Sequence, residues 1–212
     1  MKYGLSLHTE PAAEPISLSE AKKQVEVAEE IVLHDDHLTR LIITARKQFE
    51  KQTNRQLITA TWDLKLDRFP LWSGDSQNQS TPKPIHLPKC PIQSISAITY
   101  TDTSGVTQTV STSVYKLAEA REPGEVWLKF GQIWPIARFE PDVVNVRFVA
   151  GYGDAASDVP EDMKLPMLLM ISDWFENRMG EGEVSETANR LMQSCGYGDE
   201  FTQYGVPFYA AR

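Results

Sequence analysis

The sequence is poor in the residues that build disulfide frameworks, metal sites and membrane anchors. Its 212 residues include two cysteines, Cys90 and Cys195, and four histidines. The cysteines lie far apart and in no CxxC pair, which is the pattern of free thiols in a reducing compartment. No run approaches the roughly 18 consecutive apolar residues that span a bilayer, and the amino-terminal residues lack the apolar core of a signal peptide. The sequence therefore predicts neither a secreted nor a membrane protein.

Basic residues are also in short supply. There are 21 Lys and Arg residues against 29 Asp and Glu residues, which gives a formal net charge of −8. Because affinity for the phosphate backbone comes mainly from clustered Lys and Arg, this balance disfavours a protein that grips nucleic acid. An acidic surface suits a soluble assembly component, and it equally suits a channel through which DNA must slide without sticking.

Recognisable catalytic motifs are missing as well. There is no GxSxG elbow, and neither cysteine has the motif of a nucleophile. The two GYGD stretches at 151–154 and 196–199 are not followed by the Lys-Ser/Thr of a phosphate-binding loop. The HDDH cluster at 34–37 is better explained as the start of a helix than as a metal site, because no other His or Cys group supplies further ligands. We therefore predict no catalytic residue, no cofactor and no metal ion.

What the sequence does contain is a strong helix signal that passes directly into a strand signal. A single apolar stripe at spacings of three and four predicts a helix whose N-cap is Asp35. The stripe consists of Leu38, Leu41, Ile42, Ala45 and Phe49. In the following stretch, TATWDLKLDRFP, apolar and charged residues alternate, which indicates a strand with one apolar face.

Further helices are predicted near both ends of the chain. Ser17 and Glu20 form an S-x-x-E capping box at the start of a short helix. A second helix begins at Asp158, and Pro166 predicts either a kink in it or a start nearer residue 165. A short helical segment is indicated over 185–193.

Between these helices the chain shows only strand and turn signals. A hairpin is predicted from strands around 94–101 and 106–110 joined by a turn at 102–105. Three more short strands are predicted at 115–117, 125–129 and 143–149. The predicted fold class is therefore α+β, in which helices from both ends of the chain form a small helical unit and an antiparallel β module is inserted between them.

The chain divides accordingly into four predicted parts. They are an amino-terminal arm over 1–16, a helical core made of 17–56 and 158–180, an inserted β domain over 57–153, and a C-terminal tail over 181–212. We interpret the arm as a segment that is either mobile or strapped to a neighbour, because it shows little apolar periodicity. The last stretch of the tail, FTQYGVPFYAAR at 201–212, carries four aromatic residues that have no strand or helix pattern.

The order of the motifs resembles a known family. The stretches that carry the resemblance are LTRLIITARKQFEKQTNRQLITATWDLKLDRFP at 38–70, IHLPKCPIQSISAITYTDTSG at 85–105, PGEVWLKFGQIWP at 123–135, VNVRFVAGYGD at 144–154, and the 160–178 helix that ends in WFENR. Together they resemble the phage head-tail connector, or adaptor, proteins of the gp6-like family, in the branch that has a β insertion and is associated with DNA packaging. Pro166 and the longer, more acidic 181–200 segment depart from the family pattern.

The resemblance implies a structural virion protein without enzymatic activity. Its subunits would form a ring of about twelve copies that docks beneath the portal protein after packaging and bridges it to the stopper or tail-completion protein. Double-stranded DNA would pass through the ring without specific binding. The implied location is the head-tail interface of the virion, after assembly in the cytoplasm of a bacterial host, with no membrane involved.

Interface residues follow from the same resemblance. In family members the C-terminal segment reaches the portal, and buried aromatic residues tend to dominate the energy of an interface. The predicted portal anchors are Phe201, Tyr204, Phe208 and Tyr209. The charged residues predicted to contact neighbouring subunits are Arg40, Arg46, Lys47 and Lys51. Trp72 and Trp134 are also predicted to make such contacts, because they lie beside prolines near loops. A solvated helix face explains the four charged residues equally well.

Three other interpretations remain at this stage. A stopper or tail-completion protein would place the β module inside the channel. A packaging-associated hydrolase would need a cleft that gathers two or more carboxylates, or His34 and His37 with a third ligand. A small DNA-binding module would need a basic stripe, which the composition disfavours.

Overall fold

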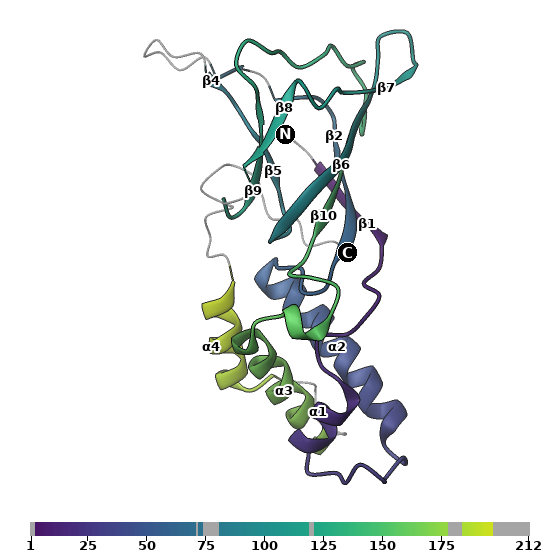
Figure 1. Ribbon diagram of the computed structural model, residues 1–212, viewed down its shortest axis with the longest axis vertical. Coiled ribbons are helices and arrows are strands. Elements are labelled where there is room, and N and C mark those ends of the chain that lie inside the picture. The colour runs from purple at the N-terminus through teal and green to yellow at the C-terminus, as the bar shows by residue number, and fades with distance from the viewer. Residues whose placement is uncertain (1–2, 71, 74–80, 119–120, 178–183, 197–212) are drawn as a thin grey trace. The chain divides into compact units, whose positions relative to one another are not determined.

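The computed structural model describes residues 3–70, 72–73, 81–118, 121–177 and 184–196, and these form two compact units (Figure 1). The β unit comprises Ala60–Ala150 together with the residues up to Glu10. The helical unit comprises Pro11–Thr59 and the described residues between Gly151 and Gly196. The described part of the chain contains no helix that is long and apolar enough to cross a membrane.

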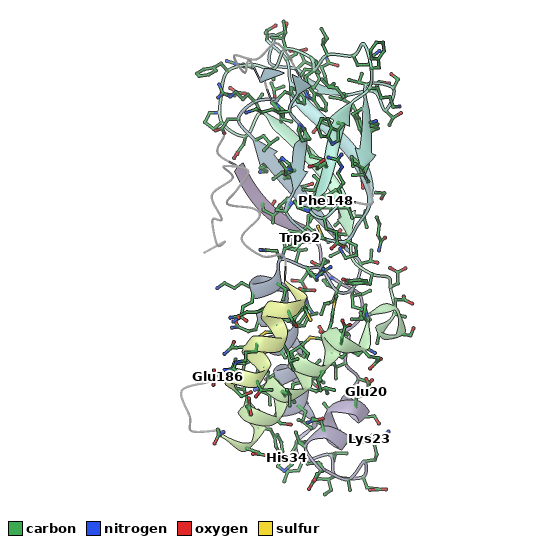
Figure 2. All side chains as sticks on the ribbon, turned by 90° about the vertical axis from the view of Figure 1, so that its left-hand side faces the viewer. Glu20, Lys23, His34, Trp62, Phe148 and Glu186 are labelled. Atoms are coloured by element: carbon green, nitrogen blue, oxygen red, sulfur yellow. The ribbon has the colours of Figure 1, made fainter. Side chains whose placement is uncertain are left out.

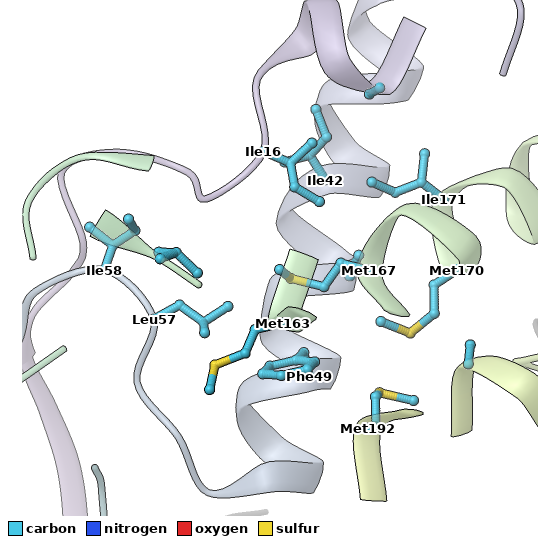
Figure 3. Close-up of a cluster of buried hydrophobic side chains, with 14 of the residues drawn as sticks. Ile16, Ile42, Phe49, Leu57, Ile58, Met163, Met167, Met170, Ile171 and Met192 are labelled. Atoms are coloured by element: carbon cyan, nitrogen blue, oxygen red, sulfur yellow. The ribbon is translucent and has the colours of Figure 1, made fainter. Parts of the chain in front are cut away.

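In the helical unit, the long helix α2 contacts three others. The helices are α1 (Leu18–Gln24), α2 (Asp35–Thr53), α3 (Glu161–Glu176) and α4 (Glu186–Cys195), with a short 3-10 helix η1 (Ala156–Asp158) before α3. Buried side chains from all four α-helices form one core, to which α2 contributes Phe49 and α3 contributes Met163, Met167 and Met170 (Figure 3). The apolar stripe predicted for α2 is buried, apart from Leu41, which is partly exposed.

The start of α1 follows its sequence signal closely. Ser17 Oγ accepts a hydrogen bond from the Glu20 amide at 3.2 Å, and Glu20 Oε2 accepts one from the Ser17 amide at 2.7 Å. Both halves of the predicted capping box are therefore present, and they satisfy two amides that the helix itself leaves without partners.

The predicted start of α2 is wrong by one residue. The N-cap is His34, and Asp35 is the first helical residue. The Asp35 carboxylate instead pairs with Lys22 Nζ at 2.7 Å, so the charge serves a contact between α1 and α2. At the other end, Asn54 takes a left-handed conformation with φ of 57°, which is a common way for a helix to terminate.

The third helix also differs from its prediction. It begins at Glu161 rather than at Asp158, which ends η1. Pro166 lies inside α3 and is buried, so the alternative start near residue 165 is wrong. Proline has no amide hydrogen to donate to the carbonyl four residues earlier. Cys195 Sγ lies 3.9 Å from that carbonyl oxygen, which belongs to Asp162.

The β unit contains a five-stranded antiparallel sheet in the order β1-β2-β10-β6-β7 and a three-stranded sheet in the order β5-β9-β8. The strands of the first are β1 (Tyr3–Thr9), β2 (Ala60–Leu66), β10 (Val144–Ala150), β6 (Ile92–Thr101) and β7 (Thr107–Thr109). Those of the second are β5 (Ile85–Leu87), β9 (Gly124–Leu128) and β8 (Tyr115–Ala118). Two short strands, β3 (Trp72–Ser73) and β4 (Thr81–Pro82), also pair with each other.

The largest difference from the sequence analysis is β1. Residues 3–9, predicted to be part of an arm, pair in antiparallel fashion with β2, from Tyr3 opposite Leu66 to Thr9 opposite Thr61. The predicted hairpin is confirmed, since β6 pairs with β7 across a turn in which Asp102 Oδ1 accepts two backbone hydrogen bonds. The α+β class with antiparallel strands is also confirmed.

The two larger sheets enclose a shared apolar core. It includes Leu64 and Phe148 from the five-stranded sheet and Leu87 and Val126 from the three-stranded sheet, all nearly or fully buried. Their close approach depends on Gly124, because a Cβ at this position would clash with the side chain of Ile92.

Candidate interaction surfaces

The histidine cluster noted in the sequence takes part in packing. The rings of His34 and His37 lie 5.4 Å and 6.0 Å, centroid to centroid, from the ring of Phe175 in α3. Across the ranges that the structure describes, no group of three or more His, Cys, Asp or Glu side chains is arranged to hold a metal ion. The start of α2, where Figure 2 labels His34, is therefore in aromatic contact with α3.

The four basic residues proposed for contacts between subunits do not share one environment. Arg40, Lys47 and Lys51 are exposed on α2. Arg46 is buried, with 7% of its surface accessible. Three of the four can therefore meet another molecule, whereas the fourth is enclosed by its own chain.

Arg46 is the centre of a buried network of hydrogen bonds. Its Nε and Nη2 donate to the two carboxylate oxygens of Glu14 at 2.7 Å and 3.2 Å, and its Nη1 donates to Glu50 Oε2 at 3.0 Å. The other Glu50 oxygen accepts from Gln56 Nε2 at 2.8 Å and from the Leu57 amide at 3.1 Å. Burial by itself would lower the pKa of Arg46, but the two carboxylates outweigh it and raise the pKa. The network ties three segments of the helical unit together.

The two tryptophans proposed for subunit contacts also differ. Trp72 lies on β3, and its side chain is not among those that the structure describes. Trp134 stacks on Phe69 with ring centroids 4.9 Å apart and an interplanar angle of 7°, and it packs against the core of the β unit. Its ring is therefore engaged within the chain. The proposed portal anchors at 201–209 lie outside the described residues.

Among the described residues, a large exposed apolar surface lies in a segment of which the sequence analysis named only Trp134 as a candidate contact. The β9-β10 loop, residues 129–143, connects β9 to β10 without a helix or strand of its own. Four large apolar side chains in it are exposed, namely Phe130 (105%), Ile133 (70%), Ile136 (79%) and Phe139 (94%). Such a concentration of exposed apolar side chains is the usual mark of an interaction site.

The backbone of the β9-β10 loop is nevertheless attached to the β unit. The Lys129 amide donates to the Val114 carbonyl at 2.9 Å, and the Arg138 amide donates to the Thr101 carbonyl at 2.9 Å. Between these two points, Ala137 packs inward, as Trp134 does, while its neighbour in the sequence, Ile136, points to solvent. These backbone hydrogen bonds and inward-facing side chains therefore attach the loop to the β unit, while its other apolar side chains face solvent.

One sequence signal could have identified this loop. The stretch FGQIWPIARF at 130–139 has five large apolar residues but neither the alternation of a strand nor the spacing of a helix. Regular elements bury apolar residues on one face, so an apolar run without a period has no obvious partner inside its own chain. The structure shows that one of the five, Trp134, is used for internal packing.

A second, smaller apolar surface lies in the helical unit. Ile31, Val32 and Leu33, in the connection between α1 and α2, are 45%, 72% and 81% exposed. The connection is held by Lys22, whose Nζ donates to the Glu29 carbonyl at 3.0 Å and pairs with Asp35. Both apolar surfaces thus occur in loops whose bases are anchored by hydrogen bonds.

Several charged side chains on the strands of the β unit, among them Asp63, Glu125 and Arg147, are paired. Arg147 forms a bidentate ion pair with Asp63, in which Nε and Nη2 donate to Oδ1 and Oδ2, each at 2.8 Å. This pair lowers the pKa of Asp63. Glu125 accepts hydrogen bonds from Arg121 at 2.5 Å and from Trp127 at 2.7 Å. These pairs neutralise charge on the strands and do not form a basic stripe.

Comparisons with solved structures show which known proteins share the fold of this chain. No family model matches the chain, and no curated protein matches it. A chain in the neck of an empty gene transfer agent (GTA) particle, computed with C6 symmetry, is similar with a TM-score of 0.74 and 18% identity over 91% of this chain and 95% of that one.

Two further solved structures agree with this match. A chain in the virion of a native GTA particle has a TM-score of 0.70 and 18% identity over 91% of this chain and 94% of that one. A chain in the neck of a native GTA particle, computed with C12 symmetry, has a TM-score of 0.64 and 19% identity over 90% and 94%. The chain therefore shares its fold, over nearly its whole length, with proteins that are part of GTA particles and their necks.

Proposed function

We propose that this protein is a structural component of the neck of a tailed phage-like particle, and specifically a head-tail connector of the gp6-like kind. The observation that carries the proposal is the similarity of fold over 91% of the chain to a GTA neck protein, of which 95% is covered. A match of that extent includes both units, so the similarity extends to the fold of each unit and is not limited to one common domain.

The residues support the same assignment independently. The order of sequence motifs resembles the connector family, and that resemblance owes nothing to the fold comparison. The excess of acidic residues, 29 against 21 basic ones, disfavours a protein that grips DNA and suits a conduit for it. In the proposed arrangement about twelve copies form a ring beneath the portal and connect it to the stopper or tail-completion protein, while DNA passes through the centre.

The cyclic symmetry of the similar necks supports the ring. Those necks were computed with C6 and C12 symmetry. Of the subunit contacts proposed from the sequence, Arg40, Lys47 and Lys51 are accessible, and we retain them. We also retain Phe201, Tyr204, Phe208 and Tyr209 as proposed portal anchors.

The location is tested by immunogold electron microscopy of assembled particles with an antibody against this chain. We expect label at the junction of head and tail, and particles that lack the protein should contain full heads without tails. Label spread over the head, or confined to the distal end of the tail, would contradict the proposal. The portal contact is tested separately by mixing purified portal protein with the full chain and with a variant that lacks residues 200–212, which should bind more weakly.

A further inference from the structure

The exposed apolar side chains of the β9-β10 loop remain without a role in the fold of the single chain. Phe130 and Phe139 are 105% and 94% exposed. From this surface we infer that the β9-β10 loop is the contact through which one copy of the protein binds the next copy of the same chain in the ring. The inference rests on the proposed function, because it names the partner of a ring subunit.

The area of this surface is suitable for a stable contact. An aromatic side chain buries roughly 150–250 Å² when it becomes enclosed, so the two phenylalanines alone offer about 300–500 Å². Ile133 and Ile136, at 70% and 79% exposure, add to that area. A standard interface needs roughly 800 Å² from each partner. The loop therefore supplies a large share of one side of such an interface from ten consecutive residues.

The loop is also prepared for binding before any partner arrives. Hydrogen bonds fix the backbone at Lys129 and Arg138, and Trp134 is stacked on Phe69 beneath it. Ordering a flexible loop on binding costs free energy, and a loop that is already held avoids most of that cost.

The charges around the loop favour a partner with a neutral, apolar surface. The loop contains two basic residues, Lys129 and Arg138, and two acidic residues, Glu140 and Asp142. Arg138 Nε pairs with Glu140 at 3.4 Å. No large excess of one sign therefore surrounds the four apolar side chains, which makes DNA an unsuitable occupant.

A second copy of the chain meets these requirements. Cyclic symmetry of the kind used for the similar necks places identical chains side by side, and each then contacts two neighbours through unlike patches. Permanent interfaces of this type are more apolar than transient ones. The β9-β10 loop is apolar, its backbone is anchored to the β unit, and its charged residues are balanced in sign. These properties suit a permanent interface between subunits.

The test uses the full chain and measures self-association by sedimentation velocity over a wide range of protein concentration. The loop variant is Phe130→Ser with Phe139→Ser. The matched control is Val32→Ser with Leu33→Ser, which removes side chains of similar exposure from the other apolar surface. Circular dichroism and thermal melting establish that both variants are folded, as the exposure of all four residues leads us to expect.

We expect the wild-type chain and the control to associate equally, and the loop variant to have a dissociation constant weaker by about 100-fold or more, as for the loss of central apolar anchors. Equal association of the loop variant would overturn the inference while leaving a ring in place. Weakening of both variants to the same degree would also overturn it, as would a wild-type chain that stays monomeric throughout. In each of these cases immunogold labelling still decides the neck location by itself.

Discussion

Replacement of Arg46 offers a sharp test of the reasoning about the helical unit. Its guanidinium is buried and bridges Glu14 and Glu50, so Arg46→Ala leaves the Glu50 carboxylate enclosed without its cation. Removal of one partner from a buried ion pair typically costs about 3–5 kcal/mol. Glu50 keeps its hydrogen bonds from Gln56 and Leu57, so we expect a value near the lower end, about 3 kcal/mol of unfolding free energy.

The assay is urea unfolding followed by circular dichroism, with Lys47→Ala as the matched control. Lys47 is the next residue on α2 and is exposed, so its loss should change the unfolding free energy by about 0.5 kcal/mol or less. A loss of about 3 kcal/mol in a chain of this size should lower Tm by about 6–12 °C. If Arg46→Ala lost less than about 1 kcal/mol, or no more than the control, the network would not be stabilising in the way described.

A double variant distinguishes charge from packing. Arg46→Met keeps most of the aliphatic volume, and we expect it to be nearly as destabilising as Arg46→Ala. When Glu50→Gln is added, the buried negative charge disappears, and part of the stability should return, with a coupling of about 0.5–3 kcal/mol. Because Arg46 is enclosed, its variants would lose stability before they revealed any contact with a neighbour. Tests of ring contacts on α2 should therefore use Arg40, Lys47 and Lys51.

Two further predictions concern the β unit. Gly124→Ala should lower the unfolding free energy by about 1–3 kcal/mol because its Cβ meets Ile92, whereas Gly4→Ala, with its Cβ 3.9 Å from Lys65, should be neutral or slightly stabilising in the same urea titration. Burial lowers the pKa of His86 below 6.5 despite the opposing charge of Glu125, so the unfolded chain takes up a proton first and stability should fall as the pH drops below about 6.5. His86→Gln should reduce this dependence between pH 7.5 and pH 5.5, and an unchanged slope would contradict the assignment.

Much of the local structure was predictable because its causes lie within a few residues. The spacing of Leu38, Ile42 and Phe49 predicts one buried face of a helix. Ser17 and Glu20 predict the start of a helix, because their hydrogen bonds join residues three positions apart. The β6-β7 turn is equally local. Signals of this kind also predicted the α+β class, because they showed a run of strands between two groups of helices.

Other features depended on partners distant in the sequence, and only the tertiary structure decided them. Residues 3–9 have a weak pattern, yet they form β1 because β2, more than fifty residues later, offers a free edge. Arg46 resembles its exposed neighbours in the sequence, and only the positions of Glu14 and Glu50 enclose it. The exposure of the apolar side chains in the β9-β10 loop could not be predicted from the sequence either, because it depends on which surfaces the rest of the chain covers. Periodicity determines which faces are apolar, whereas long-range packing determines which of them remain available to a partner.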